Sequence, residues 1–314
     1  MVHKPAWFKD GFVYVSFADT VGINKDGNTL FRVDPATGMR TTTIDDKVEA
    51  DVDALRASRA GATSRWVDSD HYSVGVPAYY SDEHTEPLVK LLKNRKYARF
   101  APRTLAELIG DGMIDARPGH GSPSADMRDG EIPYIKVSDI RAGQVNINPT
   151  NLVPRIVAER FWRGDASGLK AFDLVTPVRA SKNIGEFAVL MPGQEEMVVT
   201  KEVLILRPGP NANVDSFYLL WALSLKAVRN QWKRVVFMQT NREDVGRRYL
   251  EVAIPWTNDA NAAAAASKAF RDYYQGMQIL RADFVRSLQT SGEHHVFLGK
   301  SDELGHNETS PSSP

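Results

Sequence analysis

Three strand patterns between residues 131 and 208 constrain the fold of this chain more than any other feature. β-branched and aliphatic residues dominate each pattern, and Gly, Pro and Asn separate them, as a half-buried sheet requires. The patterns cover 132–140, answered by 145–147 across the turn 141–144; 172–178, answered by 187–190; and 197–206. They predict a compact domain rich in β-structure in the middle of the chain.

The first hundred residues predict a small α/β extension. Residues 12–17 alternate in polarity, 24–28 supply an Asp-Gly turn and 29–33 return, which predicts a β-hairpin. A second turn is expected at 34–38. Residues 48–57 then predict a short helix with Val48, Val52 and Leu55 on one face.

Helix signals flank the central strands. Thr104 followed by Glu107 has the order of a capping box and predicts a helix over 104–109. Residues 110–130 are rich in Gly, Pro, Ser and Asp and predict a long loop. Asp215 is a suitable N-cap for an amphipathic helix that continues to about Trp232. A last strand is expected over 249–254, ended by Pro255.

Residues 258–290 predict one long helix. At 1.5 Å per residue it would span about 50 Å, longer than a small domain. An apolar stripe follows one side of it, so we expect a partner, either another copy or a different subunit. The residues predicted to form this assembly surface are Phe270, Tyr273, Met277, Leu280 and Phe284. The alternative is that the helix packs only on its own domain.

The predicted fold class is α+β, with a mixed-sheet domain followed by a long helix. The expected divisions are an extension over 1–98, the central domain over 99–257, the helix over 258–290 and a disordered tail over 291–314, which is rich in polar residues. The sequence shows no signal-peptide core and no apolar run long enough to cross a membrane, so we expect a cytoplasmic protein. The absence of cysteine fits a reducing compartment and excludes thiolate metal sites.

Local basic character is the strongest direct signal for a polyanionic partner. The whole chain is neutral, with 39 basic and 39 acidic residues, yet 226–248 holds seven cations against two anions. The polar loop 179–183 offers similar donors between two strands. Cations bind DNA phosphates, and amide and guanidinium groups read base edges. The residues predicted to contact DNA are Arg179, Lys182, Asn183, Lys233, Arg234, Gln239, Asn241, Arg242, Arg247 and Arg248. A solvated helix face and an ordinary hairpin tip are the alternatives.

Other polar motifs predict no chemistry. The Gly119 and Gly121 pair lacks the strand-to-helix context of a nucleotide loop. Two acidic groups, at 45–46 and 68–70, are typical of solvated turns rather than of metal-dependent hydrolysis. The pair His294 and His295 lies in the predicted tail. We therefore expect no catalytic residues, no metal site and no cofactor.

The order of these segments resembles the specificity (S) subunit of type I restriction-modification systems, over residues 100–290. The resemblance is carried by the segment 133–145 with the sequence PYIKVSDIRAGQV, by FDLV at 172–175, by FYLLWAL at 217–223, and by the long helix that follows Ile254 and Pro255. S subunits commonly carry two recognition domains and two helices, whereas this chain has room for one of each.

Residues 11–55 are similar to the stretch that follows the catalytic domain of adenine-N6 DNA methyltransferases. The tetrapeptide that would hold a flipped adenine and the glycine-rich cofactor loop are both missing from the sequence. The resemblances together imply a DNA-recognition subunit that is not an enzyme. Its partners would be double-stranded DNA and a DNA methyltransferase subunit in restriction-modification or phage defence, with self-association through the helix as an alternative. The rival reading is an enzyme, either the C-terminal part of a split methyltransferase or a nuclease.

Overall fold

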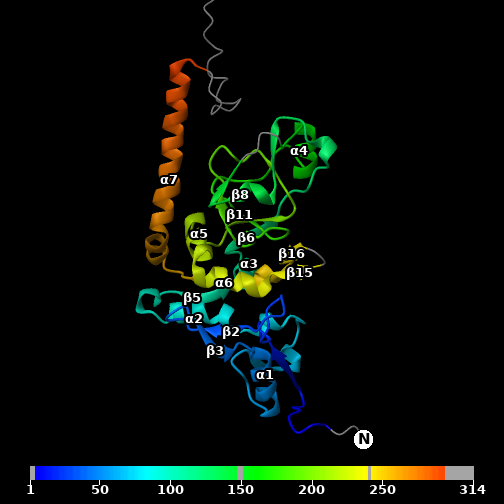
Figure 1. Ribbon diagram of the computed structural model, residues 1–314. Coiled ribbons are helices and arrows are strands. Elements are labelled where there is room, and N and C mark those ends of the chain that lie inside the picture. Colours follow the sequence, from blue (N-terminus) through cyan, green and yellow to red (C-terminus); the bar gives the residue numbers. More distant parts are fainter. Residues whose placement is uncertain (1–3, 147–150, 240–241, 294–314) are drawn as a thin grey trace, which may run out of the picture.

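The protein is elongated, with the N-terminal region at one end and the strands of the central region toward the other (Figure 1). The computed structural model describes residues 4–146, 151–239 and 242–293. Helices and strands of mixed sheets alternate along the chain, and a long helix ends the described part, so the predicted α+β class is confirmed. No helix among these residues is both long and apolar enough to cross a membrane.

The N-terminal region is built differently from the predicted hairpin. β1 (Phe12–Ser16) pairs antiparallel with β4 (Ser64–Asp68), and β2 (Phe31–Val33) pairs with β3 (Arg40–Ile44). The turn that closes a hairpin is therefore the second one. The Asp34 carboxylate accepts hydrogen bonds from Ala36 N and Thr37 Oγ1, while Gly38 takes a positive φ of 70°. The predicted pairing of 12–17 with 29–33 is wrong.

α1 (Lys47–Arg56) forms where the sequence predicts a helix, but it buries another face. Val48 and Val52 are exposed, whereas Asp51 and Ala54 are buried. The Asp51 carboxylate accepts hydrogen bonds from Ser16 Oγ at 2.7 Å and from Ser64 Oγ at 2.8 Å. A buried polar anchor, and not the apolar stripe, therefore sets the orientation of this helix.

A six-stranded mixed sheet forms the centre of the molecule. Its strand order is β6-β14-β11-β12-β9-β8, and β12 and β9 are its parallel pair. The strands are β6 (Ile114–Pro118), β14 (Val203–Pro208), β11 (Leu174–Pro177), β12 (Ala188–Val189), β9 (Gln144–Val145) and β8 (Ile140–Arg141). β6 lies inside the segment 110–130 that was predicted to be a loop. Asp115, Arg117 and Pro118 are not typical strand residues, so the sequence does not indicate this strand.

Smaller elements extend this sheet at both ends. A three-stranded sheet of β10 (Leu152–Val153), β7 (Ile132–Ile135) and β13 (Val198–Val199) carries α4 (Arg155–Trp162). At the other end, β5 (Ala101–Thr104) pairs with β17 (Ala253–Trp256), and the predicted capping box starts α3 (Leu105–Gly110). The last strand thus begins later than predicted and runs through Pro255, which faces Pro102 in a two-stranded sheet where neither N–H is needed.

The predicted helix 215–232 is two helices. Asp215 caps α5 (Ser216–Ser224) as expected, but Leu225 has an extended ψ of 132° and separates it from α6 (Lys226–Val235). α5 buries side chains on nearly every side, including Phe217, Leu219 and Leu220, because the sheet, α6 and the last helix all surround it. Each such side chain contributes about 1.5–3 kcal/mol on burial. The hairpin β15 (Phe237–Gln239) and β16 (Arg242–Asp244) follows α6.

α7 (Ala260–Ser291) confirms the predicted long helix, capped by Asp259. Its first half packs on α5: Phe270 and Met277 contact the main core, and Tyr274 Oη donates to Gly143 O at 2.9 Å. Its second half lies alongside the sheet region in Figure 1, and Leu280 is 70% exposed. The predicted apolar stripe therefore splits, because Phe270 and Met277 face inward while Tyr273, Leu280 and Phe284 are exposed.

Candidate nucleic-acid interface

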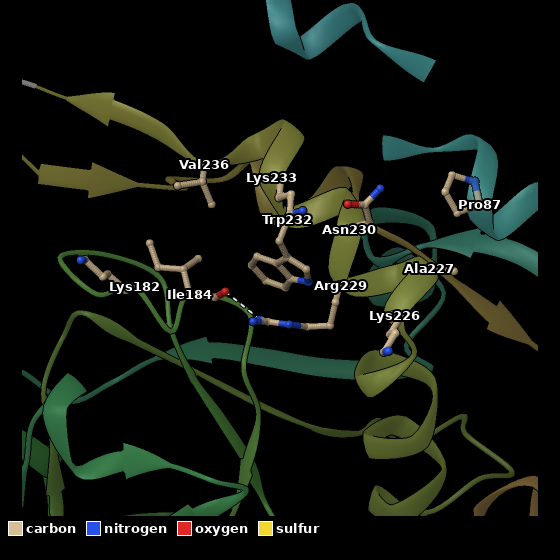
Figure 2. A pocket seen from close by; sticks show the side chains of 10 residues that line it. All are labelled: Pro87, Lys182, Ile184, Lys226, Ala227, Arg229, Asn230, Trp232, Lys233 and Val236. Carbon is tan, nitrogen blue, oxygen red and sulfur yellow. Dashed lines mark hydrogen bonds between the residues drawn. The ribbon is translucent and has the colours of Figure 1, made fainter. Parts of the chain in front are cut away.

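A groove between α6 and the loop 179–185 brings the two predicted basic segments together (Figure 2). We call it the basic groove; its volume is about 790 Å³. Its lining residues are Pro87, Lys182, Ile184, Lys226, Ala227, Arg229, Asn230, Trp232, Lys233 and Val236. Four of these are cations and none is a carboxylate, so the charge of the lining would attract an anionic ligand.

Contacts with α6 fix the position of the loop. Arg229 Nη1 donates to Ile184 O at 2.8 Å, the bond drawn in Figure 2. The Trp232 ring lies so close to Gly185 that a Cβ there would meet it at 2.5 Å, and Gly185 also has a φ of 75°. Only glycine allows both the turn and this approach. Phe187, just after the loop, packs edge-on against Trp232 with ring centroids 6.0 Å apart.

The lysines of the groove are free of carboxylate partners within the described residues. Lys182, Lys226 and Lys233 are exposed, and no ion pair forms at any of them. Arg229, in contrast, is half-buried and pairs with Glu186 at 3.2 Å. Burial lowers the pKa of the Arg229 guanidinium. Arg229 therefore holds the loop in place, while the charges of the three lysines are available to a ligand.

Next to the groove lysines, Arg234 and Asn230 of α6 are already bonded to the N-terminal region, and Asn230 also lines the groove. Arg234 Nε donates to Tyr79 O at 2.9 Å, and its guanidinium lies 4.0 Å from the centroid of the Tyr79 ring. Tyr79 Oη donates to Glu251 at 2.6 Å, and burial, followed by this bond, raises the pKa of Tyr79 to about 12. Asn230 Nδ2 donates to Glu83 O at 2.7 Å. These bonds attach the N-terminal region to the central one.

The remaining predicted DNA-contacting residues lie on or near the β15–β16 hairpin. Gln239 and Arg242 pair across its closed end, but the structure describes neither side chain, and Asn241 lies outside the described residues. Arg247 is exposed, and the Arg248 guanidinium stacks on Phe237 at 4.1 Å.

The hairpin is tied to the loop beside the groove. Arg179 forms an ion pair with Asp244 at 3.2 Å, and the two residues also form an isolated β-bridge. Asn183 is half-buried, and its backbone N–H donates to Ser181 Oγ. Loop, helix and hairpin thus form one continuous surface.

Two features of this surface escape sequence reasoning. Trp232 looks like a core residue of an amphipathic helix, yet it also forms part of the groove wall. Pro87 reaches the groove from the N-terminal region, far away in the sequence. The glycine at the end of the polar loop was the one signal that a bulky side chain approaches there.

The acidic motifs cap turns and helices in the N-terminal region. Asp46 caps α1, and Asp68 caps a short 3₁₀ turn at residues 69–71. The described residues include no group of three acidic or histidine side chains placed to hold a metal ion. His294 and His295 lie outside the described residues.

No model of a known protein family matches the sequence, and no curated protein matches it. Among solved structures, the type I restriction-modification S subunit from M. genitalium is similar, with 14% identity and a TM-score of 0.38, over 60% of this chain and 41% of that one. The HsdS subunit from Thermoanaerobacter tengcongensis has 14% identity and a TM-score of 0.35, over 63% and 46%. The type IIG restriction endonuclease BpuSI has 11% identity and a TM-score of 0.42, over 72% and 33%.

Specificity subunits, which the sequence resembles, are thus among the solved structures that match. This chain spans less than half the length of each of these three proteins.

Proposed function

We propose that this chain is a sequence-specific DNA-binding subunit that positions a partner DNA methyltransferase in a restriction-modification or related defence system. Residues 99–257 would be its target-recognition domain. The observation that carries the proposal is the continuous surface of loop 179–185, α6 and the β15–β16 hairpin, with three groove lysines that form no ion pair with any described residue. Exposed cations without carboxylate partners bind phosphates at little cost, because no internal ion pair must be broken.

The surface also offers the two kinds of contact that specific binding needs. Lys226, Lys233 and Arg247 are exposed cations suited to phosphates, which set the position of a protein on DNA. The β15–β16 hairpin has the form of a two-stranded ribbon, which the major groove of DNA can admit. Gln239 and Arg242 stand where that ribbon closes, and Asn241 lies between them in the sequence. We assign base reading to these three residues.

α7 would carry the contact with the methyltransferase or with a second copy. Its first half is fixed to α5, and Arg271 Nη2 donates to Asp215 at 2.7 Å. Tyr273 and Leu280 are exposed on its surface. Apolar side chains grouped on a helix that extends beyond its own core are typical of a partner surface. The order of sequence motifs shared with S subunits also supports a methyltransferase as the partner.

DNA binding by the purified chain tests the proposal. We expect affinity for duplex DNA to fall steeply as the salt concentration rises. The variant K226A/K233A should reduce the slope of log K against log salt concentration by about two, one for each phosphate contact that is lost. K93A/K96A is the matched control, since both lysines lie away from the groove. DNA affinity that does not change with salt, or equal effects of the two variants, would contradict the proposal.

A methylation assay separates the proposal from its rival. The chain alone should transfer no methyl group from a labelled donor to DNA, and it should confer sequence preference on a partner methyltransferase. Methyl transfer or DNA cleavage by the chain alone would favour an enzyme.

A further inference from the structure

The basic groove has the size and lining of a small-ligand pocket rather than of a surface for intact duplex. Specific DNA interfaces cover roughly 1,000–2,500 Å² of protein surface. The groove, with about 790 Å³, falls in the range of about 300–1,000 Å³ that pockets for small molecules occupy. A duplex would cover the wider surface of loop, helix and hairpin, whereas the groove itself has room for one building block of a nucleic acid.

The lining has two different chemistries. Lys182, Lys226 and Lys233 supply positive charge without carboxylate partners in the described part of the chain. Ile184, Ala227 and Val236 supply apolar wall, and the Trp232 ring lies among them (Figure 2). A simple inorganic anion would use only the lysines. A ligand that fills the groove must carry both negative charge and a flat or apolar part.

The buried indole of Trp232 does not by itself indicate a ligand. Its side chain is 2% exposed, and its indole Nε1–H is buried without an acceptor among the described residues. Buried donors in native proteins are nearly always paired, so one without a partner calls for an explanation. The indole N–H groups of Trp66 and Trp256 are likewise buried without an acceptor among the described residues, so the case for a ligand rests on the lining of the groove.

We propose that the basic groove binds a single nucleotide, with its phosphate on Lys182, Lys226 and Lys233 and its base against the half-buried Val236 and Ala227. Two ligands present the same phosphate and base to the groove: a free nucleotide and a nucleotide extruded from duplex DNA. The DNA source rests on the proposed function, whereas the free nucleotide does not.

Calorimetric titration with deoxyadenosine triphosphate, and with inorganic triphosphate at the same ionic strength, tests the chemistry. We expect the nucleotide to bind at least ten times more tightly than the inorganic anion, because only the nucleotide contacts the apolar wall. The variant K182A/K226A should weaken nucleotide binding at least tenfold, and K25A/K170A, with the same loss of charge outside the groove, should leave it unchanged. Equal affinity for the two anions, or equal effects of the two variants, would overturn the proposal.

Ala227→Asp is a second variant of the groove, and its thermal unfolding reports whether it folds, because Ala227 packs against the core. Ala227 is half-buried in the first turn of α6, where a carboxylate stabilises the helix terminus. The same carboxylate would stand in the groove and repel phosphate. We expect unchanged thermal unfolding and a tenfold or greater loss of nucleotide affinity; unchanged affinity in the folded variant would contradict the site.

Competition with DNA identifies the source. A duplex with one mispaired base loses that base from the stack more easily than a matched duplex. If the groove holds an extruded nucleotide, the mispaired duplex should bind more tightly and should compete with deoxyadenosine triphosphate. If duplexes bind without competing, the ligand is a free nucleotide, and the duplex phosphates contact cations other than Lys226 and Lys233. If nucleotide binds and no duplex does, the proposed function fails while this inference stands.

Discussion

The two sides of α6 carry similar residues and use them differently. On the side of the N-terminal region, Arg234 is bonded to Tyr79 and Glu251. On the side of the basic groove, Lys226 and Lys233 have no ion pair among the described residues. Counting cations in the sequence does not separate these roles. The difference is whether a partner within the chain already satisfies the charge.

The two halves of α7 repeat this contrast with apolar residues. Phe270 and Met277 are satisfied by the core, whereas Leu280 is exposed. In both helices, the satisfied residues hold the fold together and the unsatisfied ones are available to a ligand or a partner. Substitutions on matched positions can test this rule.

The largest effect is expected where a satisfied apolar residue of α7 is replaced by a charge. Phe270→Asp should lower the free energy of unfolding by about 2–4 kcal/mol, because an unpaired carboxylate would face the core. Leu280→Asp should change it by less than about 0.5 kcal/mol and should instead abolish association with the partner. Denaturant unfolding and sedimentation of both variants measure the two outcomes. Assembly that survives Leu280→Asp would reduce α7 to a brace of its own domain.

A smaller loss of stability should separate the two sides of α6. Arg234→Ala removes a charged hydrogen bond and a cation–π contact, which should cost about 2–3 kcal/mol of unfolding free energy. Lys226→Ala removes neither and should stay within about 0.5 kcal/mol. Urea unfolding of the two variants compares them directly. Equal losses of unfolding free energy in the two variants would mean that bonding to partners within the chain does not distinguish Arg234 from Lys226.

Base reading by the hairpin should show as a change of specificity without a change of stability. Replacing Arg242 or Gln239 by Ala should relax preference at one base position by about 1–3 kcal/mol and leave binding to random DNA nearly intact. Binding to a library of target sequences measures this. A uniform loss across all sequences would assign these side chains to phosphates.

The smallest expected effect is a pH dependence of the free energy of unfolding. It arises from His120, whose two ring nitrogens both have hydrogen-bond partners. His120 Nδ1 accepts from Val199 N at 3.0 Å, and Nε2 faces Ser167 O at 2.9 Å. Burial lowers the pKa of His120 below its usual 6.5. The unfolded chain therefore binds this proton more readily than the folded chain. The contribution of His120 to the free energy of unfolding is fully present above about pH 6.5 and is lost as the pH decreases through the folded pKa.

Thermal unfolding at a series of pH values should show this fall. The variant His120→Asn should flatten it, whereas His71→Gln, an exposed histidine, should not. A profile that is the same in the wild-type protein and in His120→Asn would place the dependence elsewhere.

Local signals predict much of this fold. The capping box of α3, the N-cap of α5, the turn at Gly143 and the length of α7 each depend on residues close in sequence, and all four are observed. The partner of β1 could not be predicted, because β4 follows almost fifty residues later and nothing in either strand specifies the other.

The candidate site was predictable in composition but not in arrangement. The sequence marks the loop 179–183 and the cluster 226–248 separately, and tertiary contacts such as Arg229 with Ile184 and Arg179 with Asp244 join them. The division of α7 into satisfied and exposed halves depends on where α5 begins, since Asp215 and Phe217 at its N-terminal end contact Arg271 and Tyr274 of α7. Such facts follow from tertiary packing, which propensity and periodicity do not encode.

The pairing of β5 with β17 has a consequence for synthesis of the protein. Ala101 lies opposite Trp256, so the two strands that close the central region leave the ribosome almost 150 residues apart. At typical rates of about 5–20 residues per second, the first strand waits for roughly 10–30 s before its partner exists. Folding of this region is therefore mainly post-translational, and the nascent chain exposes an unpaired strand edge that chaperones must protect from aggregation.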